Sequence, residues 1–251
     1  TRELIFDKST IKFNHHNGTR GIYIDYPSKL YVLQSHIIQC RADVATHYGA
    51  GIHYFGNGPV KLGYSEEINI EGTTFDGNYG AHTSSLYLQR IKKFPTLCNL
   101  TIKNSGKFDG TGGDFTLVVF FDFLPKEEFV IENITFENSK FDRFDGGGSG
   151  IWIAEYNPSQ TTRDTWQLTL ENCVFRNNHA KQSGGAISYG DSRTLTFIHV
   201  NFNRCQFIDN ECEGLHDNNH QGVGSGGGAL WINSQETVEV NNCYFTGNRV
   251  L

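Results

Sequence analysis

Apolar and polar residues alternate along this chain in short runs of three to five residues, separated by glycine-rich or polar turns. Alternation with a period of two is typical of β-strands, and no segment keeps helical periodicity over a useful length. Clear examples are the runs at 68–70, 129–131, 168–170 and 238–240. The pattern therefore predicts an all-β fold built from many short strands.

A short phrase of the form Phe-x-x-Asn recurs down the chain, for example at 175–178 and 207–210. A second phrase, Gly-Gly-Ala followed by Ile or Leu, lies between its copies at 184–187 and 227–230. Repeats of thirty-odd residues that carry several short strands each are typical of stacked architectures. The first residue of the phrase, here called the anchor, is Phe75, Ile102, Phe136, Phe175, Phe207 and Phe245 in successive copies.

Each copy is expected to supply three strands: one before the anchor, one containing it, and one after the glycine-rich turn. This order predicts a right-handed single-stranded parallel β-helix of about six to seven coils, a solenoid with pectin-lyase-like architecture. The anchors are expected to form an internal ladder. An asparagine three positions after the anchor is expected at the turn, in left-handed geometry and bonded to neighbouring coils. These asparagines are Asn78, Asn178, Asn210 and Asn248.

The composition favours one continuous domain over residues 1–251, because the chain has 28 Gly and only 5 Pro, and no linker stands out. The net charge is -6, and acidic and basic residues are interspersed. Nucleic acid is therefore not an expected partner, and no apolar run is long enough for this segment to insert into a membrane. The chain lacks methionine and stops directly after a Phe-x-x-Asn phrase, so we expect it to be a segment of a longer chain.

The ordered alternation of the two phrases resembles the repeats of the polymorphic membrane proteins, the autotransporter-like adhesins of chlamydiae. Similar repeats occur in surface proteins of some protists. The resemblance is clearest at 175–187 and 207–230, and a weaker form extends back to about Gly49. It implies a surface-exposed passenger region that serves in adhesion or as a structural fibre.

The cysteines and possible glycosylation sites bear on the compartment. Cys173, Cys205 and Cys243 share one repeat position and are expected to stack in the core as free thiols, with a disulfide among them as the alternative. Cys212 is expected in a long loop, where it could form a bond that clamps the loop. Asn-x-Ser/Thr triplets are candidate glycosylation sites in a secreted eukaryotic chain and ordinary polar turns otherwise. They begin at Asn17, Asn99 and Asn133.

Metal and cofactor sites are not expected. His216 and His220 have the four-residue spacing of a zinc pair on a helix, but they lie in a glycine-rich segment where that spacing fixes no common face. His15 and His16 are a similar case. The acidic glycine runs at 108–114 and 142–147 lack the regular ligand order of known calcium loops, and turn chemistry explains them without a metal.

An enzymatic alternative has to be weighed, because polysaccharide lyases and glycoside hydrolases include β-helix proteins. Inverting hydrolysis needs two carboxylates about 6.5–9.5 Å apart. The outward position before each anchor carries no charged cluster; its residues are Thr74, Thr101, Thr135, Val174, Gln206 and Tyr244. The Arg90-Ile91-Lys92 triplet, which matches one element of polygalacturonases, occurs in isolation.

A third possibility is a glycan-binding module, since the parity of Trp152 and Trp231 places both rings outward on the third strand. A covering loop would remove them from solvent. Taken together, the sequence favours a non-catalytic extracellular or cell-surface protein with a structural or adhesive role. We expect other copies of itself or other surface proteins as partners, with glycans as the alternative.

Overall fold

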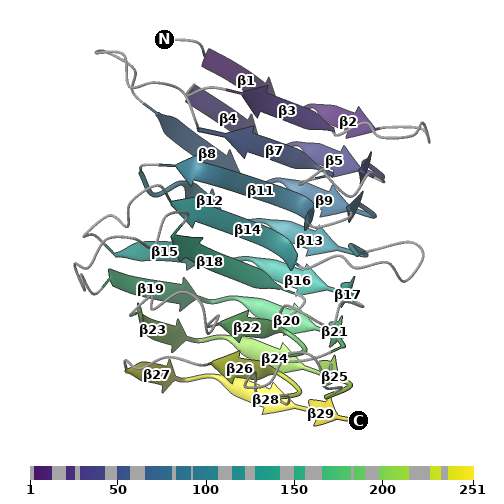
Figure 1. Ribbon diagram of the computed structural model, residues 1–251, viewed down its shortest axis with the longest axis vertical. Helices are drawn as coiled ribbons and strands as arrows, with labels where there is room; N and C mark the ends of the chain where they lie inside the picture. The colour runs from purple at the N-terminus through teal and green to yellow at the C-terminus, as the bar shows by residue number, and fades with distance from the viewer. Residues whose placement is uncertain are drawn as a thin grey trace.

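All strand pairings in the computed structural model are parallel, and the described residues contain no helix, which confirms the all-β prediction. Figure 1 shows the strands lying across the long axis, with the N-terminal strands at one end and the C-terminal strands at the other. The structure describes residues 3–12, 21–25, 29–42, 50–56, 66–80, 83–91, 93–106, 115–121, 128–141, 150–155, 166–181, 184–189, 198–214, 227–232 and 237–251.

Two eight-stranded sheets run the length of the described chain. Sheet A contains β1 (Glu3–Asp7), β4 (Lys29–Leu33), β8 (Glu67–Glu71), β12 (Thr96–Cys98), β15 (Phe129–Glu132), β19 (Trp166–Glu171), β23 (Ile198–Asn203) and β27 (Val238–Asn241). Sheet B contains β2 (Thr10–Lys12), β5 (His36–Ile38), β9 (Thr74–Asp76), β13 (Thr101–Lys103), β16 (Thr135–Glu137), β20 (Val174–Arg176), β24 (Gln206–Ile208) and β28 (Tyr244–Thr246). Every strand of sheet B follows one of sheet A in the sequence.

The third strand set forms sheet C, with β3 (Ile22–Asp25), β7 (Ile52–Phe55), β11 (Thr83–Ile91), β14 (Phe115–Phe121) and β18 (Ile151–Glu155). A separate pair, β22 (Ile187–Tyr189) and β26 (Leu230–Ile232), belongs to the same position in later repeats. Two-residue strands follow sheet B: β6 (Arg41–Ala42) pairs with β10 (Tyr79–Gly80), and β17 (Lys140–Phe141), β21 (His179–Ala180), β25 (Glu211–Cys212) and β29 (Arg249–Val250) form a small sheet.

The repeat begins earlier than the sequence motif indicates. Sheet B has eight strands in the described residues, whereas six anchors were predicted. The two additional anchors are Ile11 and Ile37, which hold the phenylalanine position in β2 and β5. Cys40 stands where later repeats have asparagine, so neither half of the phrase marks the repeat of Ile37, and the repeat of Ile11 keeps only the asparagine, Asn14, in its sequence.

The predicted anchors lie in register on adjacent strands of sheet B and point inward. Phe75, Ile102, Phe136, Phe175 and Phe207 have no exposed surface, whereas Phe245 on β28 is 44% exposed. The four consecutive phenylalanine rings from Phe136 to Phe245 stack nearly parallel, with centroids 4.7–5.1 Å apart. Offset ring stacking at this spacing adds to the ordinary stabilisation from burial.

A tight bend precedes each strand of sheet B, and in the described residues a second bend follows each strand from β5 onward; one left-handed residue makes each bend. Between sheets A and B these residues are Lys8, Gln34, Gly72, Asn99, Asn133, Asn172, Arg204 and Asn242. After sheet B they are Gln39, Gly77, Asn104, Asn138, Asn177, Asp209 and Gly247. The left-handed residue thus directly precedes Asn178 and its equivalents. The expectation that these later asparagines themselves adopt left-handed geometry is wrong, because none of them has a positive φ and the residue before each makes the bend.

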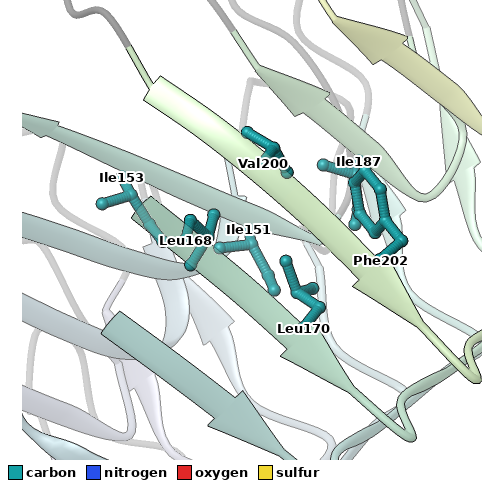
Figure 2. Close-up of a pocket in the computed structure, with 7 residues that line it drawn as sticks. All are labelled: Ile151, Ile153, Leu168, Leu170, Ile187, Val200 and Phe202. Atoms are coloured by element: carbon teal, nitrogen blue, oxygen red, sulfur yellow. The ribbon is translucent and has the colours of Figure 1, made fainter. Parts of the chain in front are cut away.

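One hydrophobic cluster fills the space enclosed by the sheets. Sheet C is interrupted between β18 and β22, and an apolar space of about 10 Å³ lies beside this interruption. Figure 2 shows its lining residues, which come from β18, β19, β22 and β23: Ile151, Ile153, Leu168, Leu170, Ile187, Val200 and Phe202. A space of this size is at the limit for one water molecule, so it is a packing defect and no ligand pocket.

Candidate functional site

A ladder of asparagine side chains runs through the interior at the bend after sheet B. In Asn210, the side-chain oxygen Oδ1 accepts the backbone N–H of Asn178 at 3.1 Å, and Nδ2 donates to the carbonyl oxygen of Phe175 at 3.0 Å. Asn248 repeats both bonds one repeat later, toward Asn210 and Phe207. Asn78 and Asn178 make the same pair of bonds to the repeats before them. The predicted asparagines therefore join neighbouring repeats within the core.

The three cysteines that share a repeat position also lie together, at the bend between sheets A and B. Cys173 and Cys205 are buried, and the backbone N–H of Cys205 donates to Sγ of Cys243 at 3.3 Å. The Cys205 thiol donates to the carbonyl oxygen of Leu170 at 3.3 Å. A hydrogen bond between the thiols of Cys173 and Cys205 lowers the pKa of Cys205. The same hydrogen bond, together with burial, raises the pKa of Cys173. All six thiols are free in the structure.

Cys212 departs from the prediction that it lies in a long loop. It occupies β25, has no exposed surface, and pairs in register with Ala180 and Val250. The segment that follows, 215–226, lies outside the described residues. Burial in a paired strand gives Cys212 a packing role like that of the alanine beside it.

The outward face of sheet C is aromatic near the N-terminus. Tyr23, His53 and Tyr87 are register neighbours on β3, β7 and β11, and the His53 ring lies 5.1 Å and 4.9 Å from the two tyrosine rings. Tyr23 is 49% exposed, but Tyr87 is only 3% exposed. Trp231 on β26 is half-buried. The backbone of Trp152 pairs with Val118, and its side chain lies outside the described residues.

Carboxylates on the outward face of sheet A are held by neighbouring strands. Glu67 interacts with Lys29 at 3.1 Å, and hydrogen bonds from Tyr31 and Lys29 lower its pKa. Glu171 pairs with Arg204 and accepts a hydrogen bond from Asn203 at 2.6 Å. Within the described ranges, no three His, Cys, Asp or Glu side chains converge in a way that could hold a metal ion.

Two predicted glycosylation sites occupy equivalent positions in consecutive repeats. Asn99 is exposed and Asn133 is half-buried, and Nδ2 of Asn133 donates to Oδ1 of Asn99 at 3.1 Å. Asn172 continues this outer amide ladder with a 2.7 Å bond to Asn133. The sequence signal for this outer ladder is an asparagine three positions before the anchor. It recurs in these repeats, but the sequence pattern alone gave it no role. Whether either site carries glycan stays a prediction.

One candidate glycosylation site and the segments considered and not favoured for metal binding lie outside the described residues. They are Asn17, the histidines His15, His16, His216 and His220, and the acidic glycine runs at 108–114 and 142–147. The segment 156–165, which joins β18 to β19, also lies outside the described residues.

Sequence reasoning also missed a charged column on the outward face of sheet B. The residue after each anchor points outward, and in four consecutive strands its charge alternates in sign. These residues are Asp76, Lys103, Glu137 and Arg176. The signal was present in the repeated phrase, two positions beyond the threonines considered as outward residues and directly after the anchor.

Comparison of the chain with protein-family models, with curated proteins and with solved structures finds no match. In the described part of the chain, no helix has the length and apolar character needed to cross a membrane. The described residues form hydrogen-bonded ladders in the interior and polar, aromatic and charged columns on the outer faces of the sheets. Such columns are suited to contact with a partner.

Proposed function

We propose that the chain is a right-handed parallel β-helix and that it serves as a non-catalytic structural or adhesive component outside the cell or at its surface, as an adhesin passenger or a filament component. The observation that carries the proposal is the continuity of the interior ladders. Asparagine, cysteine and phenylalanine columns link successive repeats by hydrogen bonds and ring stacking. A body joined in this way resists bending and presents the same outward columns along its length.

The coiled architecture is supported by the order in which the chain enters the sheets. It passes from sheet A to sheet B to sheet C and returns to sheet A one strand further along. Crossovers between parallel strands are right-handed in nearly all proteins. Eight strands at about 4.8 Å spacing give a body about 34 Å long.

The surface location and the adhesive role are supported by the resemblance of the two alternating phrases to repeats of polymorphic membrane proteins. Partners of this function are other copies of the chain or other surface proteins. They would contact the outward columns of the sheets, where side chains project at regular intervals.

Immunogold electron microscopy tests this proposal, with antibodies against the chain applied to intact, unpermeabilised cells of its source. Gold on the outer surface is expected. In a separate assay, the purified chain should release no reducing ends or unsaturated sugars from pectin, alginate or chitin. Gold confined to the cell interior, or depolymerisation of one of these substrates, would contradict the proposal.

Glycan binding is a second candidate, favoured by the 49% exposure of Tyr23 and the partial exposure of Trp231 on outward positions of the third strand set. Exposed rings stack on the apolar faces of sugars. Affinity electrophoresis through gels that contain polysaccharide tests this candidate. Retardation that is lost in both Tyr23→Ala and Trp231→Ala supports it, and equal mobility of all three proteins with and without polysaccharide excludes it for the glycans used.

A further inference from the structure

The outward face of sheet B consists of two columns of side chains, because the middle residue of each three-residue strand points inward, buried from β5 to β24, and the two beside it point outward. All strands pair without a register shift. The first column is Thr10, His36, Thr74, Thr101, Thr135, Val174, Gln206 and Tyr244. The second column is Lys12, Ile38, Asp76, Lys103, Glu137, Arg176, Ile208 and Thr246.

The charges of the second column are complementary to those of the same column read in the opposite direction. Its four central charges are negative, positive, negative and positive, so the reversed order has the opposite sign at every position. A two-fold axis along the strands, between the rows of Lys103 and Glu137, brings a second copy face to face with its rows reversed. Lys103 then faces Glu137 of the other copy, and Asp76 faces Arg176. An isologous interface requires this kind of self-complementarity.

The flanking rows match under the same operation. Ile38 faces Ile208, so apolar residues meet at both ends of the charged segment. In the first column, Thr101 faces Thr135 and Thr74 faces Val174, and these small side chains permit close approach. No like charges meet in either column.

We propose that the outward face of sheet B is a contact surface for a second copy of this chain, which binds through this two-fold axis. The inference rests on the register of sheet B alone, so it stands or falls separately from the proposed surface function. If both hold, the contact joins neighbouring rods side by side.

The charges are placed to serve this contact. Lys103 Nζ lies 3.5 Å from Asp76 Oδ2, and Asn104 Nδ2 donates to Asp76 Oδ1 at 2.8 Å, so bonds within one copy fix both side chains while about a third of each stays exposed. No ion pair joins Glu137 to Arg176 within the described residues. Glu137 and Arg176 can therefore each pair with a charge on the facing copy.

The face is small. Strands of three residues are about 10 Å long, and eight rows extend for about 34 Å. This footprint is below the roughly 800 Å² per partner that stable complexes bury, so the pairing is weak and depends on concentration. Alternating charges then fix the register of the two copies more than they add affinity.

Sedimentation equilibrium on the 251-residue chain tests the proposal, at concentrations up to about 1 mM and at low and high salt. The wild-type chain is expected to show a monomer–dimer equilibrium that weakens with salt. Lys103→Glu and Glu137→Lys each create two like-charge contacts because of the symmetry. Each single variant is expected to raise the dissociation constant at least about tenfold.

The double variant Lys103→Glu with Glu137→Lys restores opposite charges across the interface, and its dissociation constant should return to within about threefold of wild type. Glu132→Lys, on the outward face of sheet A, is the matched control and should change nothing. Far-UV circular dichroism shows that all variants keep their strands. A wild-type chain that stays monomeric, single variants that dimerise normally, or a double variant that fails to recover would each overturn the proposal.

Discussion

At the scale of single residues, the fold depends on polar groups that are buried and fully bonded. Asn210 has no exposed surface, yet its amide bonds to backbone groups of the preceding repeat and to Asn178 and Asn248. A buried amide stabilises a protein only while its partners are in place, because each unpaired donor or acceptor costs its full desolvation free energy.

Replacing Asn210 with leucine should lower the free energy of unfolding by about 2–5 kcal/mol, because the N–H of Asn178 and the carbonyl of Phe175 lose their partners inside the core. Urea denaturation measures the loss. Asn241→Leu is the matched control, since Asn241 is exposed on β27, and its effect should stay within about 0.5 kcal/mol. Equal effects of the two substitutions would show that the interior amide ladder carries no special stability.

A buried thiol makes stability depend on pH. Burial raises the pKa of Cys40 from 9.0 to about 12, so the folded chain keeps this thiol neutral where the unfolded chain ionises it. The unfolded state then binds fewer protons, and stability falls as the pH rises from 9 to 12. Thermal melts across this range should show a shallower decline for Cys40→Ala than for wild type. Parallel declines would contradict the assignment to Cys40.

At the scale of elements, backbone atoms of neighbouring repeats approach each other closely at the glycine-rich turns. A Cβ atom on Gly185 would overlap the carbonyl oxygen of Gly228 and come within 2.7 Å of the backbone of Glu211. The second glycine of the Gly-Gly-Ala phrase is therefore required for backbone approach between neighbouring repeats. Gly77 has a different role, since its φ of +62° makes a bend at which an added Cβ would only contact the Gln39 side chain at 3.5 Å.

These two roles predict different losses of unfolding free energy on substitution. Gly185→Ala should cost at least about 2 kcal/mol, because backbone atoms cannot move aside without disturbing the stack. Gly77→Asn should cost less than about 1 kcal/mol, because asparagine fills the same left-handed position in later repeats, as at Asn104 and Asn138. Chemical denaturation of both variants is the measurement. A tolerated Gly185→Ala would show that the turn relaxes more than its contacts indicate.

The elements also show how much of the structure can be predicted from the sequence. The strands of sheet B around Phe136 and Phe175 follow from the repeated phrase, since a regular anchor implies a regular inward position. The first repeats were missed because isoleucine replaces phenylalanine at Ile11 and Ile37 and, unlike at the anchor Ile102, no asparagine stands three positions earlier. The alternating charges beside the anchors went unrecognised because residues more than twenty positions apart become neighbours only once the register is known. Long segments between strands vary in length and composition, so no repeat rule places them.

At the scale of the whole molecule, each repeat is stabilised mainly by its two neighbours. Phe175 stacks against Phe136 and Phe207 and is fully buried, whereas Phe245 stacks against Phe207 alone and is 44% exposed. The same side chain therefore contributes differently according to its position along the stack.

Phe175→Ala should cost about 3–5 kcal/mol, and Phe245→Ala in the 251-residue chain should cost less than half as much. Calorimetry of the two variants gives the comparison directly. The larger loss is expected at Phe175, because the cavity there has packed neighbours on both sides. Equal losses would mean that unfolding is not governed by contacts between adjacent repeats.

We propose that stacked repeats make this chain a surface structural or adhesive protein, and electron microscopy of the native material tests this role most directly. Isolated from its source, the protein should form ordered filaments or elongated rods, with strands stacked about 4.8 Å apart along the long axis. A dispersed population of small particles, without elongation or assembly, would contradict the claim.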